Sequence, residues 1–238
     1  MEFEGIVIRR TSCKEGAAMI NVLTNNKIRS FLAKGVLKTT SKNAPSVNLF
    51  TKSKFNVYHG QDGDWLRQGE IVESYPNIIK DFEKLAILDF ISEITNSLLG
   101  TNDCGDVYHF LEKTLQCLNS DFSPLTATLI YFAKVLKAAG YGLDVDKCAI
   151  CGKKEAITAL SYKDGGFICD KCFDASNHAK TDVRKLKIFR YIFKVDIENF
   201  DRVAFGNDEA KQIIFELSEF LNFASQIEFK SLTLLKQI

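Results

Sequence analysis

Cys148-Ala149-Ile150-Cys151 and Cys169-Asp170-Lys171-Cys172 are two C-x-x-C pairs separated by seventeen residues. This spacing is typical of a tetrahedral zinc site, because each pair turns tightly enough to aim both sulfurs at one point. The segment between the pairs is long enough to fold back as a short hairpin, with turn residues at Gly152 and Gly165-Gly166. The sequence predicts one Zn²⁺ ion with the ligands Cys148, Cys151, Cys169 and Cys172.

The predicted zinc site is structural rather than catalytic. Four thiolates close the coordination sphere and leave no position for water or substrate. His178, six residues after Cys172, is an alternative ligand, although the cysteines already complete the preferred count. A redox dithiol is a further alternative, but it needs only one C-x-x-C pair.

Charge is segregated along the 238 residues, although the net charge is only +1. Residues 1–76 contain 11 Lys and Arg against 7 Asp and Glu, and the remaining residues contain 20 against 23. A basic first part favours an anionic partner for that part of the chain.

The start of the chain is acidic, and no apolar run of about 18 residues occurs, so we expect neither a signal peptide nor a membrane partner. Cys13, Cys104 and Cys117 show no pairing pattern. Unpaired cysteines beside a zinc site fit a reducing cytosol, which predicts a cytoplasmic protein.

Five short segments with β-branched and aromatic residues precede Pro76, namely 3–9, 19–23, 28–33, 50–58 and 65–74. Five strands in fewer than 80 residues predict a small closed barrel, of which the OB-fold is a common form. The basic stretch 34–48 lacks a strand pattern and is expected to form a loop or short helix.

After Pro76 the sequence pattern changes, and apolar residues recur three or four positions apart. This spacing predicts helices over 78–99, 107–118, 123–140, 182–193 and 208–223. The predicted fold is α+β and multidomain. An OB-fold barrel domain covers residues 1–76. An α-helical domain covers residues 77–238 and carries the four-cysteine zinc module at about 146–178.

Basic residues of the barrel region are candidates for contacts with DNA phosphates: Arg9, Arg10, Lys14, Arg29, Lys34, Lys38 and Lys42. The run 34–42 is the best of these, since it combines three lysines with three hydroxyls; a solvated loop is the alternative. Most nearby aromatic residues should fill the barrel, with Trp65 a candidate for stacking on a base.

A second basic cluster lies on the helix after the zinc module and is a candidate docking face for an acidic peptide or DNA, with a solvated helix face as the alternative: Arg184, Lys187, Arg190 and Lys194. The sequence contains no phosphate loop, no dinucleotide-binding turn, no H-E-x-x-H and no G-x-S-x-G motif. We therefore interpret the protein as a non-enzyme.

Five stretches of the sequence form a pattern in a fixed order along the chain. Four of them are residues 5–10 (Gly-Ile-Val-Ile-Arg-Arg), 32–36 (Leu-Ala-Lys-Gly-Val), 69–76 (Gly-Glu-Ile-Val-Glu-Ser-Tyr-Pro) and 230–232 (Lys-Ser-Leu). The most specific stretch is 140–152, Gly-Tyr-Gly-Leu-Asp-Val-Asp-Lys-Cys-Ala-Ile-Cys-Gly. Through these stretches the chain resembles the RecO family of bacterial recombination mediators over nearly its full length.

This resemblance implies an N-terminal OB-fold, a helical C-terminal domain and a zinc module. It also implies binding of single- and double-stranded DNA, ATP-independent annealing of complementary strands and a cytoplasmic, nucleoid-associated location. The implied partners are RecR and the acidic tail of single-strand binding protein. Together with RecR, such proteins help RecA to load onto DNA that is covered by single-strand binding protein. The alternative is a zinc-stapled protein-interaction adaptor that does not bind DNA.

Overall fold

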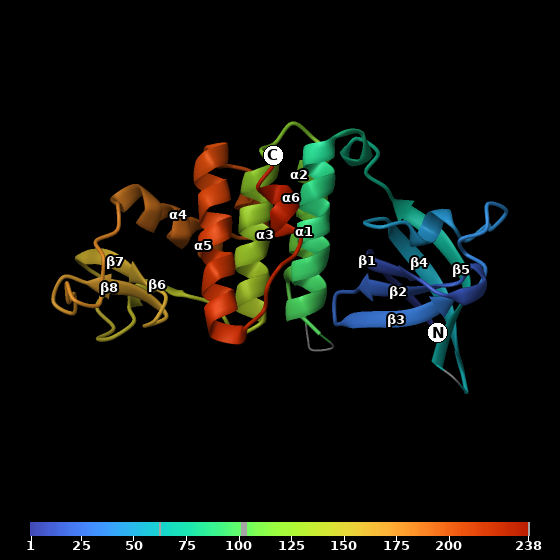
Figure 1. Cartoon of the computed structure of the whole chain (residues 1–238), viewed down its shortest axis with the longest axis horizontal. Helices are drawn as coiled ribbons and strands as arrows, with labels where there is room; N and C mark the ends of the chain where they lie inside the picture. Colours follow the sequence, from blue (N-terminus) through green and yellow to red (C-terminus); the bar gives the residue numbers. More distant parts are fainter. Residues whose placement is uncertain (62, 101–103, 238) are drawn as a thin grey trace. The chain divides into compact units, whose positions relative to one another are not determined.

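The first five strands of the computed structural model close into a barrel in the order β1-β2-β3-β5-β4 (Figure 1). They are β1 (Glu2–Ser12), β2 (Ala18–Leu23), β3 (Ile28–Ala33), β4 (Lys52–Gly60) and β5 (Gly63–Glu73). Neighbouring strands are antiparallel except β3 and β5, whose parallel pairing closes the barrel. The predicted five-stranded barrel is confirmed. The structure describes residues 1–61, 63–100 and 104–237.

Large side chains fill the barrel because alternate residues of each strand point inward. Phe31 and Phe55 are buried in this core with their ring centroids 5.2 Å apart, and Val57 and Leu66 pack with them. The predicted loop after β3 consists of turns and the short 3-10 helix η2 (Pro45–Val47). Another 3-10 turn, η1 (Lys14–Gly16), connects β1 to β2.

Compact packing divides the chain into two units. One comprises Met1–Pro124 together with Phe229–Ile238, and the other comprises Leu125–Glu228. The first unit therefore contains the barrel, the next two helices and the end of the chain. The predicted domain boundary after residue 76 stays a prediction.

The helices of the first unit are η3 (Ile78–Lys80), α1 (Phe82–Leu98), α2 (Val107–Leu118) and α6 (Leu232–Leu235). Helix α2 has the predicted bounds. Helix α1 begins later than predicted because Asp81 is extended and caps it, accepting the backbone N–H groups of Glu83 and Lys84. Helix α6 was not predicted from the sequence.

Helix α1 is attached to the barrel at an irregularity of β1. The register between β1 and β2 shifts around Ile8, and the Ile8 carbonyl accepts the Ser92 hydroxyl at 2.6 Å and the Asn96 side-chain amide at 3.2 Å. A bulge of this kind leaves a backbone group outside the ladder, and here α1 satisfies it.

The end of the chain is held on α1 by one carboxylate. Glu93 accepts the backbone N–H groups of Lys230 and Ser231 at 3.0 and 2.9 Å, and also the Ser231 hydroxyl. The Phe229 ring meets Phe90 edge to face, 5.8 Å between centroids. The Lys-Ser segment near the end of the sequence thus has a structural role in this unit.

The second unit contains α3 (Pro124–Ala138), α4 (Val183–Lys194), η4 (Ile197–Asn199) and α5 (Asn207–Ser225), together with β6 (Asp144–Cys148), β7 (Ile157–Ser161) and β8 (Gly166–Cys169). The sheet order is β6-β8-β7. The predicted hairpin is confirmed as β7 and β8; the parallel strand β6 was not predicted. Among the described residues, no helix has both the length and the apolar character needed to span a membrane.

A buried lysine of α3 supports the end of α4. Lys134 is 9% exposed, and its ammonium donates to the carbonyls of Phe193 at 3.1 Å and Val195 at 2.6 Å. The last carbonyls of a helix have no partner within the helix and carry partial negative charge, so a cation is favourable there.

Lys134→Met is expected to lower the free energy of unfolding of the second unit by about 1–3 kcal/mol, because buried carbonyls lose their donor. Chemical denaturation measures this change. Lys137→Met is the matched control, since Lys137 lies on the same helix but is exposed. Equal stability of the two variants would contradict the assigned role of Lys134.

Candidate metal centre and nucleic-acid interface

The four predicted metal ligands come together in the structure. The sulfurs of Cys148, Cys151, Cys169 and Cys172 all lie within 4.8 Å of one another, and those of Cys151 and Cys169 are 3.6 Å apart. Zn–S distances of about 2.3 Å place sulfurs roughly 3.8 Å apart in a tetrahedron, whereas a disulfide needs about 2.05 Å. The cluster can therefore bind one metal ion through four sulfurs.

Parallel strand pairing brings the two cysteine pairs to one place. Strands β6 and β8 are parallel neighbours, and they end at Cys148 and Cys169. Both C-x-x-C turns therefore begin at the carboxyl ends of adjacent strands, on the same side of the sheet. The first turn is closed by the N–H of Gly152, which donates to the Cys148 carbonyl at 2.8 Å. Gly152 has φ +76°, a conformation that favours glycine.

The protein itself prepares a thiolate in this cluster. Burial disfavours the charged form of Cys148, but backbone N–H groups of Cys151, Cys169 and Ile150 bond to its sulfur and lower its pKa to about 6. The neighbouring sulfurs, above all that of Cys151, raise the pKa of Cys172 to about 12. Thiolate is the form that binds a metal, so the amide groups favour a cation at the centre.

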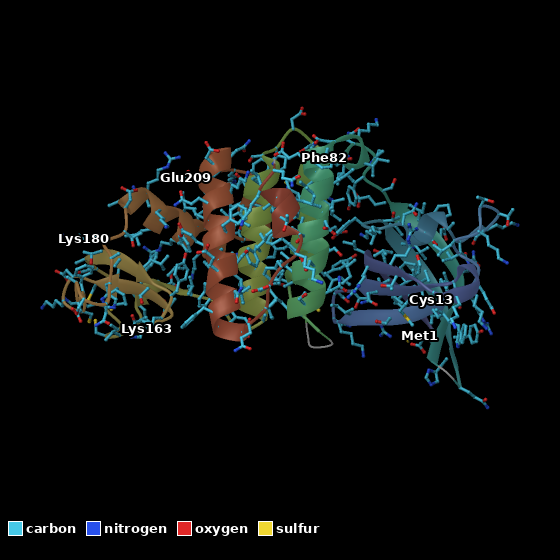
Figure 2. The ribbon with its side chains drawn as sticks, viewed as in Figure 1. Met1, Cys13, Phe82, Lys163, Lys180 and Glu209 are labelled. Carbon is cyan, nitrogen blue, oxygen red and sulfur yellow. The ribbon has the colours of Figure 1, made fainter. Side chains whose placement is uncertain are left out.

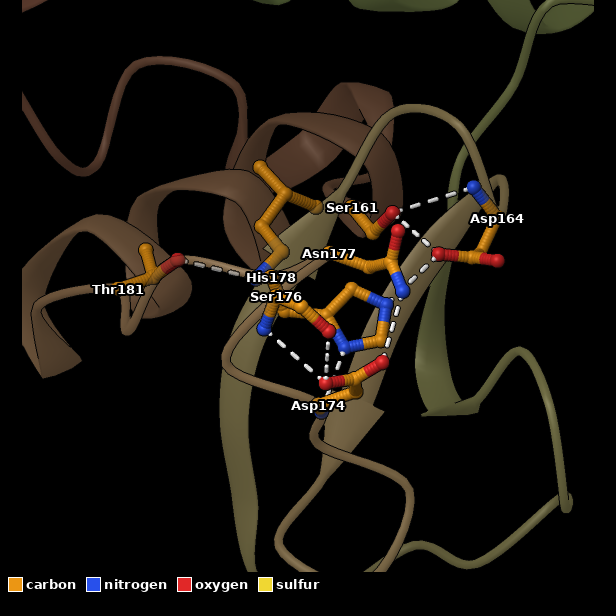
Figure 3. A network of polar contacts seen from close by, with 8 residues as sticks. Ser161, Asp164, Asp174, Ser176, Asn177, His178 and Thr181 are labelled. Atoms are coloured by element: carbon orange, nitrogen blue, oxygen red, sulfur yellow. Dashed lines mark hydrogen bonds and ion pairs between the residues drawn. The ribbon is translucent and has the colours of Figure 1, made fainter.

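His178, the alternative ligand, is engaged elsewhere. Its Nε2 lies 3.0 Å from a carboxylate oxygen of Asp164, and its Nδ1 accepts the backbone N–H of Asp174 at 3.0 Å (Figure 3). Asp164 also accepts the Ser161 hydroxyl, which with His178 lowers the pKa of this carboxyl. His178 thus joins the β7–β8 turn to the loop after the second cysteine pair.

Two loops of the barrel bring predicted phosphate contacts together. The N–H of Leu37 donates to the Gly16 carbonyl at 2.9 Å, which joins the turn containing Lys14 to the turn containing Lys34 and Lys38. The amide of Asn43, next to Lys42, donates to the Arg67 carbonyl and accepts the N–H of Gly69. All four lysines are exposed on loops fixed to the barrel.

The three predicted arginines lie in different settings. Arg9 and Arg10 are exposed near the end of β1, where Arg10 donates to the Asn48 side chain at 3.0 Å. Arg29 lies at the start of β3, at the opposite end of that strand from Lys34, with its guanidinium 5.0 Å from the Phe3 ring centroid. The structure does not bring Arg29 together with the loop lysines.

Two cations lie over aromatic rings on the outside of the barrel, and the candidate contact residues from the sequence include Lys34 and Trp65 but not Arg67. The Lys34 ammonium lies 3.7 Å from the Trp65 ring centroid, and the Arg67 guanidinium lies 5.3 Å from that of Tyr58. Tyr58 and Trp65 are directly paired across β4 and β5. Arg67 lies where the register of β4 and β5 shifts, so strand alternation alone did not indicate its place beside Tyr58.

Other basic residues are already neutralised. Lys52 forms ion pairs with Glu4 and Glu112, which raise its pKa even though burial opposes the charge. Most of the α4 cluster is similar, since Arg190 and Lys194 face Asp146 at 3.8 and 2.7 Å.

Arg184 of α4 is also paired. Its guanidinium donates twice to Glu209, near the start of α5, at 2.7 and 2.9 Å. Lys187 is the exposed member of this predicted docking face for which the described contacts show no ion pair.

The barrel, the following helices and the four-sulfur cluster define an OB-fold protein with a metal-binding module. Residues 1–75 match the family described as "Recombination protein O N terminal", and residues 79–233 match "Recombination protein O C terminal". The chain belongs to the RecO family of DNA repair proteins.

Proteins named DNA repair protein RecO are similar to this chain over most or all of its length. DNA repair protein RecO of Thermoanaerobacter sp. (strain X514) is 26% identical over 97% of this chain and 95% of its own length. The Listeria innocua serovar 6a protein of the same name is 31% identical over 88% of this chain and 81% of its own length. The Oceanobacillus iheyensis protein of the same name is 27% identical over 100% of this chain and 93% of its own length.

Cys148→Ser is expected to reduce bound metal from one ion per chain to nearly none and to destabilise the second unit by several kcal/mol, because structural zinc sites carry about 10–16 kcal/mol of apparent binding free energy. Elemental analysis and thermal unfolding measure both effects. Cys13→Ser is the control, since Cys13 is exposed in the loop after β1 (Figure 2). An unchanged melting profile without metal would contradict a structural role.

Proposed function

We propose that this protein binds single- and double-stranded DNA through the basic outer face of its barrel and anneals complementary strands without nucleotide hydrolysis. The observation that carries the proposal is the joined pair of loops that presents the exposed lysines Lys14, Lys34 and Lys38 in a RecO-family chain, with Lys34 over the half-buried ring of Trp65. Lysine ammonium groups bind phosphate, and aromatic faces accept unstacked bases.

Annealing of this kind needs no catalytic residue. Two strands repel each other through their phosphates, and protein cations that replace the condensed counterions reduce this repulsion. The bases then supply the pairing energy themselves. The proposed role is therefore that of a non-enzymatic mediator.

The proposed metal is zinc, with a structural role. The four-sulfur donor set and the spacing of the sulfurs suit Zn²⁺, and a shell of four protein ligands leaves no open position for chemistry. In this proposal the ion holds β6, β8 and their turns together, and DNA contacts belong to the barrel.

The proposal includes RecR and the acidic tail of single-strand binding protein as partners, with RecA loading as the outcome. The α4 cluster (Arg184, Lys187, Arg190 and Lys194) is the candidate face for the acidic tail. Because Asp146 and Glu209 already pair with three of these cations, a peptide carboxylate would have to exchange with them, and Lys187 is the natural first contact.

Replacing Arg9, Arg10, Lys34 and Lys38 by glutamine is expected to weaken binding to single-stranded DNA and to reduce the slope of log affinity against log salt by up to about 3, since each lost phosphate contact removes about 0.7. Fluorescence anisotropy titrations at several salt concentrations measure both quantities.

The matched control replaces four exposed lysines of the metal module, Lys153, Lys154, Lys163 and Lys171, by glutamine. This variant loses the same charge and should bind DNA almost as the unaltered protein does. A larger loss in the control than in the barrel variant would place the DNA contacts elsewhere.

An annealing assay tests the function directly. Complementary strands coated with single-strand binding protein are mixed with and without this protein, in the absence of ATP. We expect duplex formation to be faster with the protein and the barrel variant to lose most of this effect. Partner binding without any acceleration of annealing would instead favour the adaptor function.

A further inference from the structure

We propose that Trp65 and Tyr58 form a base-stacking subsite specific for single-stranded DNA, in which Lys34 and Arg67 leave the ring faces to bind the flanking phosphates. This inference rests on the proposed DNA-binding function and names the form of DNA and the residues that select it. It depends only on residues of the barrel.

The four side chains form one row on the outside of the barrel. Tyr58 and Trp65 are cross-strand partners. Arg67 lies where the register of β4 and β5 shifts, and its guanidinium over the Tyr58 ring places it on the same side of the β4–β5 ribbon. Their neighbours Val57 and Leu66 point to the core. Lys34 reaches this row because β3 pairs with β5 at Leu32 and Trp65, two residues before Lys34.

Each ring is paired with a cation in the absence of DNA. Lys34 lies over the indole and Arg67 over the phenol, at 3.7 and 5.3 Å from the ring centroids. A cation over a ring that is partly open to solvent is a weak interaction. Stacking of a base on the same ring is stronger, and the displaced ammonium or guanidinium gains a phosphate partner, so the exchange favours the DNA-bound arrangement.

The local backbone leaves room for the indole. Gly60 lies two residues after Tyr58 on β4, and a Cβ at Gly60 would be only 3.1 Å from Nε1 of Trp65 and 3.2 Å from its Cδ1. The Tyr58 side chain is itself 39% exposed. Trp65 is half-buried with Lys34 over its ring, so both rings lie outside the core that Phe31 and Phe55 fill.

The arrangement distinguishes single strands from duplex DNA. The bases of a duplex are stacked within the helix and expose only their edges, so they cannot cover the rings of Trp65 and Tyr58. Duplex DNA can use the lysines alone. The subsite should therefore add affinity only for unpaired strands, which are the reactants of annealing.

Trp65 is the single tryptophan of the chain, so its fluorescence reports on this position alone. Titration of the full-length protein with an oligo(dT) single strand is expected to quench the tryptophan emission, and an equal-length duplex is expected to leave it nearly unchanged. Trp65→Leu should reduce affinity for oligo(dT) by about tenfold to a hundredfold with little effect on the duplex. Trp65→Phe keeps a ring and should retain most of the affinity.

Lys34→Met separates the two roles of the lysine. It should preserve the quenching by oligo(dT) and reduce the salt slope by about 0.7, because one phosphate contact is lost while the ring remains. Anisotropy with labelled DNA distinguishes the outcomes. Binding of oligo(dT) with no quenching, and with full affinity in Trp65→Leu, overturns the stacking subsite and leaves the proposed function intact. The absence of binding to either form of DNA overturns both.

Discussion

The parallel pairing of β3 with β5 is the constraint on which the candidate DNA-binding face depends. It closes the barrel at Leu32 and Trp65, and Lys34, the first residue after β3, is therefore held over the Trp65 ring. The following loop must return to β4, and Asn43 bonds it to β5 on the way. Without this closure the basic loop would keep its hydrogen bond from Leu37 to Gly16, but Lys34 would have no fixed relation to the Trp65 ring.

The second unit uses the same kind of pairing for a different purpose. The β7–β8 hairpin is local, but the two cysteine pairs meet because β6 is parallel to β8. A three-stranded sheet of 4 or 5 residues per strand buries little apolar surface, and such small modules commonly need a metal or disulfides. The four-sulfur cluster can bind one metal ion at this place, and in the proposed function that ion supplies the reinforcement.

Features with a local signal could be predicted from the sequence. The spacing of the four cysteines predicts their cluster, the alternation of residues predicts the five strands, and the apolar periodicity predicts α2. The pairing state of the charges could not be predicted, because it depends on residues distant in the sequence. In the sequence, Lys52 resembles any other lysine of a strand, and its ion pair with Glu112 is visible only in the structure. Likewise α4 has a basic sequence, but Lys194 is paired with Asp146, which lies 48 positions away. The hydrogen bond from Ser231 to Glu93 spans 138 positions and has no local signal. Helix α6 has only 4 residues, too few to show an apolar period.

The central claim is that DNA lies on the outer face formed by the β3–β5 closure. Photochemical cross-linking of a single strand that contains 5-iododeoxyuridine, followed by mass spectrometric identification of the attached peptide, tests it most directly. The account predicts attachment within the segments that contain Lys34 to Lys42 and Tyr58 to Arg67, at Trp65 or Tyr58 in particular. Attachment mainly within residues 147–194, with the barrel peptides unmodified, would contradict it.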